Sequence, residues 1–167
     1  MTEPTAPAAV RTIGDNPTTL WGLTTAERVR RIARAAGLAA DGGDADQGPV
    51  LLANAGFAFD PAWLRHAAAR PGFILTYGGV PVLARTRNGE ESARIETAMR
   101  TEAAIEPTAG MELLAYEDGP TIENKQLRKR ETPFLMPLRP ETVRALERAS
   151  YFGAYKGVTD LLTKYLW

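Results

Sequence analysis

Residues 50–64, VLLANAGFAFDPAWL, decide the fold class of this chain. The apolar run Val50–Ala53 is bounded by turn residues, a pattern typical of a short strand buried on both faces of a sheet. Asp60 suits the N-cap of a helix and Pro61 its first position, so a helix is expected from there to about Ala69. A buried strand followed closely by a helix indicates an α/β architecture.

Upstream, the sequence predicts another strand and another helix. Val10–Ile13 is expected to form a short strand. Thr24 and Glu27 have the spacing of a capping box, in which each side chain satisfies a backbone N–H of the other residue at a helix start. Gly37 follows the last apolar position of this helix and is expected to end it. Residues 1–9 are rich in Pro, Ala and Thr and are expected to be loose.

Downstream, strands and helices continue to alternate. Runs 73–77 and 80–85 are separated by two glycines, which predicts a hairpin with a primed turn, because such turns need positive φ angles. Residues 89–104 are expected to be helical and 111–116 to form a further strand. This alternation predicts a three-layer α/β domain, a sheet with helices, over roughly residues 10–120.

Composition excludes several chemistries. The chain has no Cys, which rules out disulfides, thiolate nucleophiles and cysteine-ligated zinc. His66 is the only histidine, so an HExxH zinc site is impossible. No run approaches about 18 apolar residues, and the N-terminus lacks a basic start and an apolar core. Neither a membrane span nor a signal peptide is therefore predicted.

Charge is unevenly divided along the chain, although its formal sum is zero. Residues 1–120 carry 11 Lys/Arg and 15 Asp/Glu, a net charge of −4, whereas residues 121–167 carry 9 and 5, a net charge of +4. The basic part is divided into a connecting segment with a helix, 121–154, and a tail, 155–167. This charge suits an anionic lipid surface better than DNA, which needs a stronger excess, so no nucleic-acid partner is expected.

The tail, YKGVTDLLTKYLW, is amphipathic. Its apolar residues recur at helical spacing and form one stripe. They are Val158, Leu161, Leu162, Tyr165 and Leu166. Its last pair, Leu166-Trp167, is expected at a water–membrane boundary or against a partner. We therefore expect a juxtamembrane helix in a protein that continues beyond Trp167; the alternative is a last helix packed on the domain core.

Three further features are weighed against plainer explanations. Asp41, Asp44 and Asp46 lack the spacing of an EF-hand, which favours a solvated loop over a divalent-ion site. His66 has no Ser or Cys partner nearby in sequence, which favours a surface or half-buried histidine over a general base. The glycine pair at 78–79 lies between two strands, which favours a hairpin turn over a phosphate loop.

The last third of the chain resembles the cytoplasmic N-terminal region of bacterial CDP-alcohol phosphatidyltransferases. In that family an (L)RKR-x-x-P-F segment precedes a helix with an acidic residue, and then a YKGVTDLxTKxxW juxtamembrane helix. The matching residues are Leu127, Arg128, Lys129, Arg130, Pro133, Phe134, Glu147, Tyr155, Lys156, Gly157, Val158, Thr159, Asp160, Thr163, Lys164 and Trp167.

The front of the chain is similar, more weakly, to sugar-nucleotide nucleotidyltransferase domains. LWGLTTAERVRRIARAAGL, residues 20–38, resembles the segment after their phosphate loop, and residues 50–64 resemble the strand that ends there in a metal-binding Asp. The Gly-rich, Arg-bearing phosphate loop is missing, and Gly56 stands at the metal-Asp position. The resemblance therefore implies a degenerate, Rossmann-like domain that keeps the fold without the chemistry.

Together the resemblances imply the cytoplasmic portion of a membrane CDP-alcohol phosphatidyltransferase of phospholipid biosynthesis, at the cytoplasmic face of the bacterial inner membrane. Such enzymes displace CMP from a CDP-alcohol with an acceptor hydroxyl. They use Mg²⁺ or Mn²⁺ held by an Asp-rich motif in the membrane domain, which nothing here matches. No catalytic, cofactor or metal residue is therefore expected in this chain, which alone would be inactive.

The expected partners are the membrane surface and a following transmembrane domain, with a homodimer left open. The expected membrane or phosphate contacts are Arg128, Lys129, Arg130, Lys156, Lys164, Tyr165 and Trp167. For 128–130 an ordinary solvated charge run is the alternative. Two rival functions also stay open: a nucleotidyltransferase-like domain that binds CTP or a sugar phosphate, and a non-catalytic interaction module whose tail packs on a protein.

Overall fold

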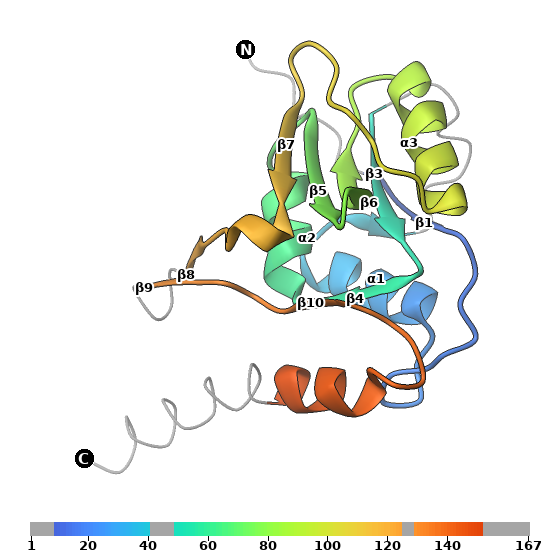
Figure 1. Ribbon diagram of the computed structural model, residues 1–167, viewed down its shortest axis with the longest axis vertical. Helices are drawn as coiled ribbons and strands as arrows, with labels where there is room; N and C mark the ends of the chain where they lie inside the picture. Colours follow the sequence, from blue (N-terminus) through green and yellow to red (C-terminus); the bar gives the residue numbers. More distant parts are fainter. Residues whose placement is uncertain (1–8, 41–48, 125–128, 152–167) are drawn as a thin grey trace.

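A computed structural model describes residues 9–40, 49–124 and 129–151 (Figure 1). Its centre is a six-stranded mixed sheet in the order β2-β1-β3-β6-β5-β7. The strands are β1 (Ala9–Ile13), β2 (Ala39–Ala40), β3 (Val50–Asn54), β5 (Phe73–Tyr77), β6 (Val80–Arg85) and β7 (Glu112–Ala115). β6 is antiparallel to β3 and β5, and the other neighbours in the sheet pair in parallel. The strands expected around residues 10, 50, 73, 80 and 112 are confirmed.

Helices cover both faces of this sheet. They are α1 (Thr25–Ala35), α2 (Pro61–Ala68) and α3 (Gly89–Thr101). Buried side chains of α1 and α2 belong to one core cluster and those of α3 to another, on the opposite face. The described part of the chain is thus a mixed α/β structure, as expected, with helices, sheet and helix in layers (Figure 1).

Local capping explains where α1 and α2 begin. Glu27 N donates to Thr24 Oγ1 at 3.2 Å and Thr24 N to Glu27 Oε2 at 2.8 Å, which confirms the capping box. Asp60 Oδ1 accepts from Ala62 N at 2.8 Å, with Pro61 in the first turn.

The tight turn between β5 and β6 is also as expected. Gly78 and Gly79 have φ angles of 57° and 81°, the positive values of a primed turn. Side chains larger than glycine rarely adopt both angles, so this pair fixes the register of the hairpin.

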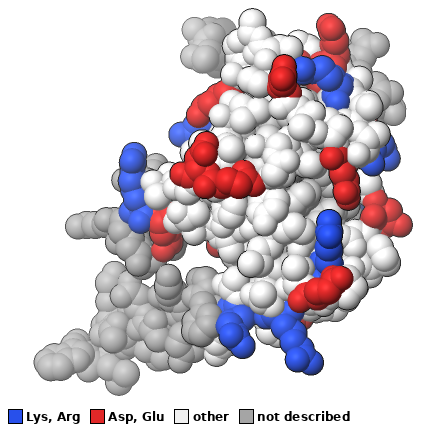
Figure 2. Space-filling view, in the orientation of Figure 1, with Lys and Arg blue, Asp and Glu red and all other residues white. Residues whose placement is uncertain are grey.

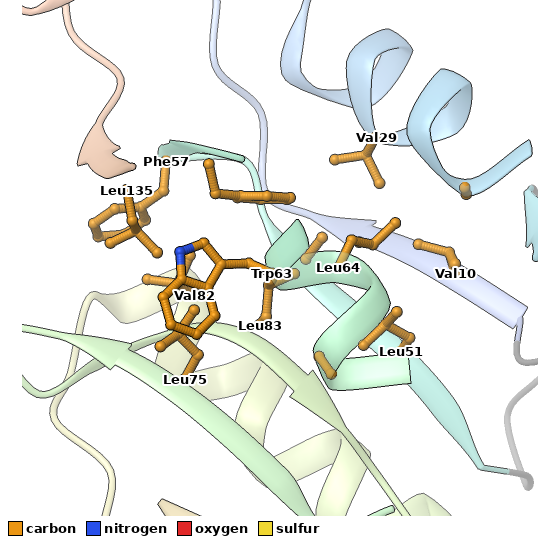
Figure 3. Close-up of a cluster of buried hydrophobic side chains, with 14 of the residues drawn as sticks. Val10, Val29, Leu51, Phe57, Trp63, Leu64, Leu75, Val82, Leu83 and Leu135 are labelled. Carbon is orange, nitrogen blue, oxygen red and sulfur yellow. The ribbon is translucent and has the colours of Figure 1, made fainter. Parts of the chain in front are cut away.

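The core on the α1/α2 face is centred on Trp63. Figure 3 shows its ring, carried by α2, among side chains of the sheet and of β10 (Leu135–Pro137), including Leu75, Val82 and Leu135. All of these side chains are buried. Burying each such side chain stabilises the fold by about 1.5–3 kcal/mol, so Leu135 anchors β10 on the core.

Residues after β7 also take part in the fold. η1 (Tyr116–Asp118) follows β7, and β8 (Ile122–Asn124) pairs with β9 (Lys129–Glu131) in a separate hairpin. β10 pairs antiparallel with β4 (Phe57–Phe59). A helix then occupies 143–151, which confirms the helix expected from about residue 140.

That helix packs on the domain. Leu146 is fully buried against Leu20, Ala58 and Leu138, with Val143 beside them. The described part of the segment expected to connect the domain to the tail therefore contributes three strands, β8, β9 and β10, and a helix to the structure. Over the three described ranges, no helix is long and apolar enough to cross a membrane. The predictions for residues 1–8 and for the tail lie outside the described residues.

Candidate functional site

The carboxyl ends of the parallel strands are where α/β sheets of this kind bind ligands. β1, β3, β5 and β7 end at a common edge, which faces helix 143–151 in Figure 1. The residues at this edge are Ile13, Asn54, Tyr77 and Ala115. The same edge carries Gly56, the position that the nucleotidyltransferase resemblance assigns to a metal-binding Asp.

Asn16 ties the loop after β1 to this edge. Its Nδ2 donates to Ala55 O at 3.1 Å and to Leu138 O at 3.0 Å, while its Oδ1 accepts from Thr18 N at 3.0 Å. One amide thus joins three segments that are distant in sequence. The space outside β1 is consequently filled by the chain itself.

The turn after β3 is held by buried polar groups. Asn54 Oδ1 accepts from Gly56 N at 2.9 Å, and its Nδ2 donates to Pro81 O at 3.0 Å. Thr25 Oγ1 donates to Ala55 O at 3.0 Å. Ala55 O and Gly56 N of the turn are therefore hydrogen-bonded within the protein, and they do not need a ligand as a partner.

Gly56 is itself engaged on both sides. Its carbonyl accepts from Leu138 N at 2.8 Å. A Cβ built at this position would lie 3.2 Å from Asn54 Oδ1, closer than an ordinary contact. The backbone here is therefore paired with a later segment of the chain.

That later segment, residues 133–138, is called the strap below. Pro133 O accepts from Trp63 Nε1 at 3.1 Å and from Tyr116 Oη at 3.2 Å. Phe134 O accepts from Asp60 N at 2.9 Å, and β10 continues the strap along β4. The strap therefore crosses the carboxyl edge and is bonded to it at several points.

Burial also affects the ionisation of Tyr116, whose hydroxyl is hydrogen-bonded to the strap. It raises the pKa of Tyr116, which lies with its ring against Trp63 and stacked near Tyr77. A phenol is protonated at physiological pH even without this shift, so Tyr116 Oη donates to Pro133 O at 3.2 Å. Trp63 and Tyr116 thus both hold the strap by hydrogen bonds to Pro133 O.

Two hollows lie beside α1. A cavity of about 10 Å³ lies between α1 and β4, lined by residues that include Thr25, Arg28 and Phe57. That volume holds about one water molecule. A larger hollow of about 230 Å³ borders β1, β2 and α1 instead. It is smaller than a typical small-molecule site, and it lies to the side of the carboxyl edge.

His66 is half-buried, as the sequence indicated. Its ring lies against Phe73 and Trp63, with centroid distances of 5.1 and 6.0 Å. Its Nδ1 lies 3.0 Å from Arg70 Nη1, so the neutral imidazole accepts there. Burial, together with Arg70, lowers the pKa of His66, while Glu112 opposes this shift. The ring nitrogen that a general base would use is already engaged.

The predicted membrane contacts are only partly described. Lys129 and Arg130 belong to β9, and Arg130 is exposed. The hairpin of β8 and β9 projects from the body of the molecule in Figure 1. Arg128 and the tail residues Lys156, Lys164, Tyr165 and Trp167 lie outside the described residues, as do Asp41, Asp44 and Asp46. Within the described ranges, no group of three or more His, Asp or Glu is placed to hold a metal ion.

Two residues that sequence reasoning did not single out have unusual environments. Trp21 is 57% exposed, with a φ of 53° in the left-handed region. The signal for this turn in the sequence is the pair Trp21-Gly22 between Leu20 and Leu23, since X-Gly pairs flanked by apolar residues form tight turns. Arg85 is only 7% exposed, and burial lowers its pKa. An arginine at the end of an apolar strand pattern does not by itself reveal such burial.

Comparisons with protein-family models, curated proteins and solved structures give no match to this chain.

Proposed function

We propose that this chain is the non-catalytic cytoplasmic domain of a membrane CDP-alcohol phosphatidyltransferase. In this proposal the α/β domain is a degenerate nucleotidyltransferase-like fold, and residues 155–167 are a juxtamembrane helix. The resemblance of residues 127–167 to that family supports the identity of the enzyme. The strap supports the loss of chemistry, because it occupies the edge at which an α/β domain would bind a nucleotide.

Opening this edge would cost free energy. A nucleotide there would displace bonds such as Leu138 N to Gly56 O and Asn16 Nδ2 to Leu138 O. Each is worth about 0.5–1.5 kcal/mol, and burial of Leu138 adds to them. Since about 1.4 kcal/mol is a tenfold change in affinity, losing two or three such contacts weakens the binding of a ligand by about tenfold to a thousandfold.

The same contacts give the domain a positioning role. Leu146 packs in a buried cluster with Leu20 and Leu138. This packing fixes the direction of helix 143–151 relative to the sheet. This helix directly precedes the residues that resemble a juxtamembrane segment. The domain would therefore set the position of the membrane part without taking part in its chemistry.

An activity measurement separates the two parts. The complete reading frame of the gene is expressed, and its membranes are assayed for release of CMP from a panel of CDP-alcohols with Mg²⁺ or Mn²⁺. We expect CMP release in these membranes and none from the 167-residue chain alone. Release by the chain alone, or no release by the membranes with any donor, contradicts the proposal.

A further inference from the structure

Trp21 is exposed on the surface, in a turn whose backbone conformation is unfavourable for a large side chain. Leu20 N donates to Leu23 O at 2.9 Å, and Leu23 N donates to Leu20 O at 3.1 Å. This closes a two-residue turn in which Trp21 and Gly22 have φ angles of 53° and 73°. Those angles favour Asn-Gly, and they are unfavourable for a residue with a large side chain. Backbone strain that exposes an indole points to a function.

The turn is anchored on helix 143–151. Leu20 is fully buried, and it packs with Leu138 and Leu146. Trp21 N lies 3.4 Å from Glu147 Oε1 on that helix. The exposed indole of Trp21 therefore belongs to a turn fixed beside the helix, although the two segments are far apart in sequence.

The helix turns a basic and aromatic stripe outward. Arg144, Arg148 and Tyr151 are spaced at i, i+4 and i+7 and so share one face. All three are exposed, Tyr151 by 53%, whereas Val143 and Leu146 pack inward. In Figure 2, Lys and Arg side chains gather at the lower edge of the molecule, over this helix.

Exposed Trp, Tyr and Arg together suit the headgroup region of an anionic bilayer. Indole and phenol rings combine an apolar body with a polar edge, and they concentrate at membrane–water boundaries. Arginine reaches lipid phosphates while its stem lies along apolar surface.

A second copy of the chain fits this surface less well. A stable dimer buries about 800 Å² per partner, with an apolar centre. Over the described ranges, the exposed large apolar side chains are Trp21, Met136 and Tyr151. In a symmetric dimer through helix 143–151, the guanidinium groups of Arg144 and Arg148 would face their own copies across a twofold axis, or lose water without a partner.

We propose that the Trp21 turn and the outward stripe of helix 143–151 bind an anionic bilayer surface. This contact is additional to residues 128–130 and the tail. The inference rests on the proposed function, because a cytoplasmic domain of a membrane enzyme is held beside such a bilayer surface. Two weak contacts on one domain act together through their high effective concentration, and they fix its orientation on the bilayer.

Flotation of the 167-residue chain with phosphatidylglycerol-rich vesicles tests this surface. Trp21→Asn replaces the indole with the side chain that the turn prefers, so the fold is retained. We expect about a tenfold lower partition coefficient for this variant, and a melting temperature no lower than that of the wild type. Arg144→Gln/Arg148→Gln is expected to lower partition by about tenfold or more.

The matched control is Arg65→Gln/Arg100→Gln, which removes the same charge from exposed positions on α2 and α3. It should stay within about twofold of the wild type, because exposed charges far from the bilayer are screened. Absence of wild-type flotation, unchanged partition of both test variants, or equal loss in the control overturns the inference. Normal CMP release by the complete protein together with any of these results leaves the proposed function standing.

Discussion

Arg85 is the residue whose surroundings suit its chemistry least. It lies at the end of β6, opposite Leu51 of β3. Its Nε and Nη1 are buried and have no hydrogen-bond partner in the structure. Burial lowers its pKa, and no acidic group contributes to the shift. A guanidinium in this position costs stability that an apolar side chain of similar length would restore.

We therefore expect Arg85→Met to raise the free energy of unfolding by about 1–2 kcal/mol, because it removes two buried, unpaired donors. Urea denaturation followed by circular dichroism measures this change. The control is Arg65→Met on α2, where the side chain is exposed and the expected change is within about 0.5 kcal/mol. A clear loss of stability in Arg85→Met would show that the guanidinium has a favourable role.

His66 makes stability depend on pH in a defined direction. Its pKa is lowered in the folded state, so the unfolded chain binds a proton first as the pH falls. The stability due to neutral His66 is complete above its unfolded pKa of about 6.5 and is lost as the pH falls from there toward the folded value.

Because His66 is the only histidine, His66→Gln isolates this contribution. Between about pH 7.5 and pH 5.5, the wild type should lose more unfolding free energy than the variant does. Urea titrations at several pH values provide the comparison. Parallel pH profiles for the two proteins would contradict the assigned shift.

Among the elements, those set by neighbouring residues are the ones that the sequence predicts. Thr24 with Glu27, Asp60 with Pro61, and the glycine pair at 78–79 each define a cap or turn within a few residues. Their geometry follows from local hydrogen bonds and φ angles, so it is visible in sequence order.

Elements that depend on distant partners were not predicted. β4 and β10 are each three residues long, and they form strands because they pair with each other. β6 was expected as the second strand of a hairpin, but its antiparallel place beside β3 depends on the whole sheet. Short runs such as these have no periodicity that a local pattern can reveal. The strap was consequently missed, and with it the closure of the candidate site.

The attachment of helix 143–151 depends mainly on one side chain. Leu146→Ala should lower the free energy of unfolding by about 2–4 kcal/mol, because Leu146 is fully buried. We also expect the substitution to speed amide hydrogen exchange, relative to the wild type, more at Leu138 and at Val143 of the helix than at Leu52 in β3, since the helix and the end of the strap loosen first. Mass spectrometry of exchanged peptides measures this difference. Ala145→Ser, at an exposed neighbouring position, is the control; equal exchange in both variants would argue against this anchor.

At the scale of the whole molecule, the described residues form an α/β structure whose carboxyl edge is covered by the strap. The loop after β1, the turn after β3 and the strap meet there, and they satisfy one another's polar groups. Gly56 stands at the position that the resemblance assigns to a metal-binding Asp. Its carbonyl accepts a hydrogen bond from Leu138 N, in the strap. A closed edge of this kind is what the proposed positioning role requires, because a nucleotide could bind there only by displacing the strap.

The central claim is that the strap closes the carboxyl edge, and titration of CTP with Mg²⁺ by calorimetry tests it most directly. We predict no saturable heat up to ligand concentrations of about 1 mM, because binding would require the strap to leave Gly56 and Trp63. Saturable binding of CTP in the micromolar range would contradict the account, and it would favour a surviving nucleotide-binding domain.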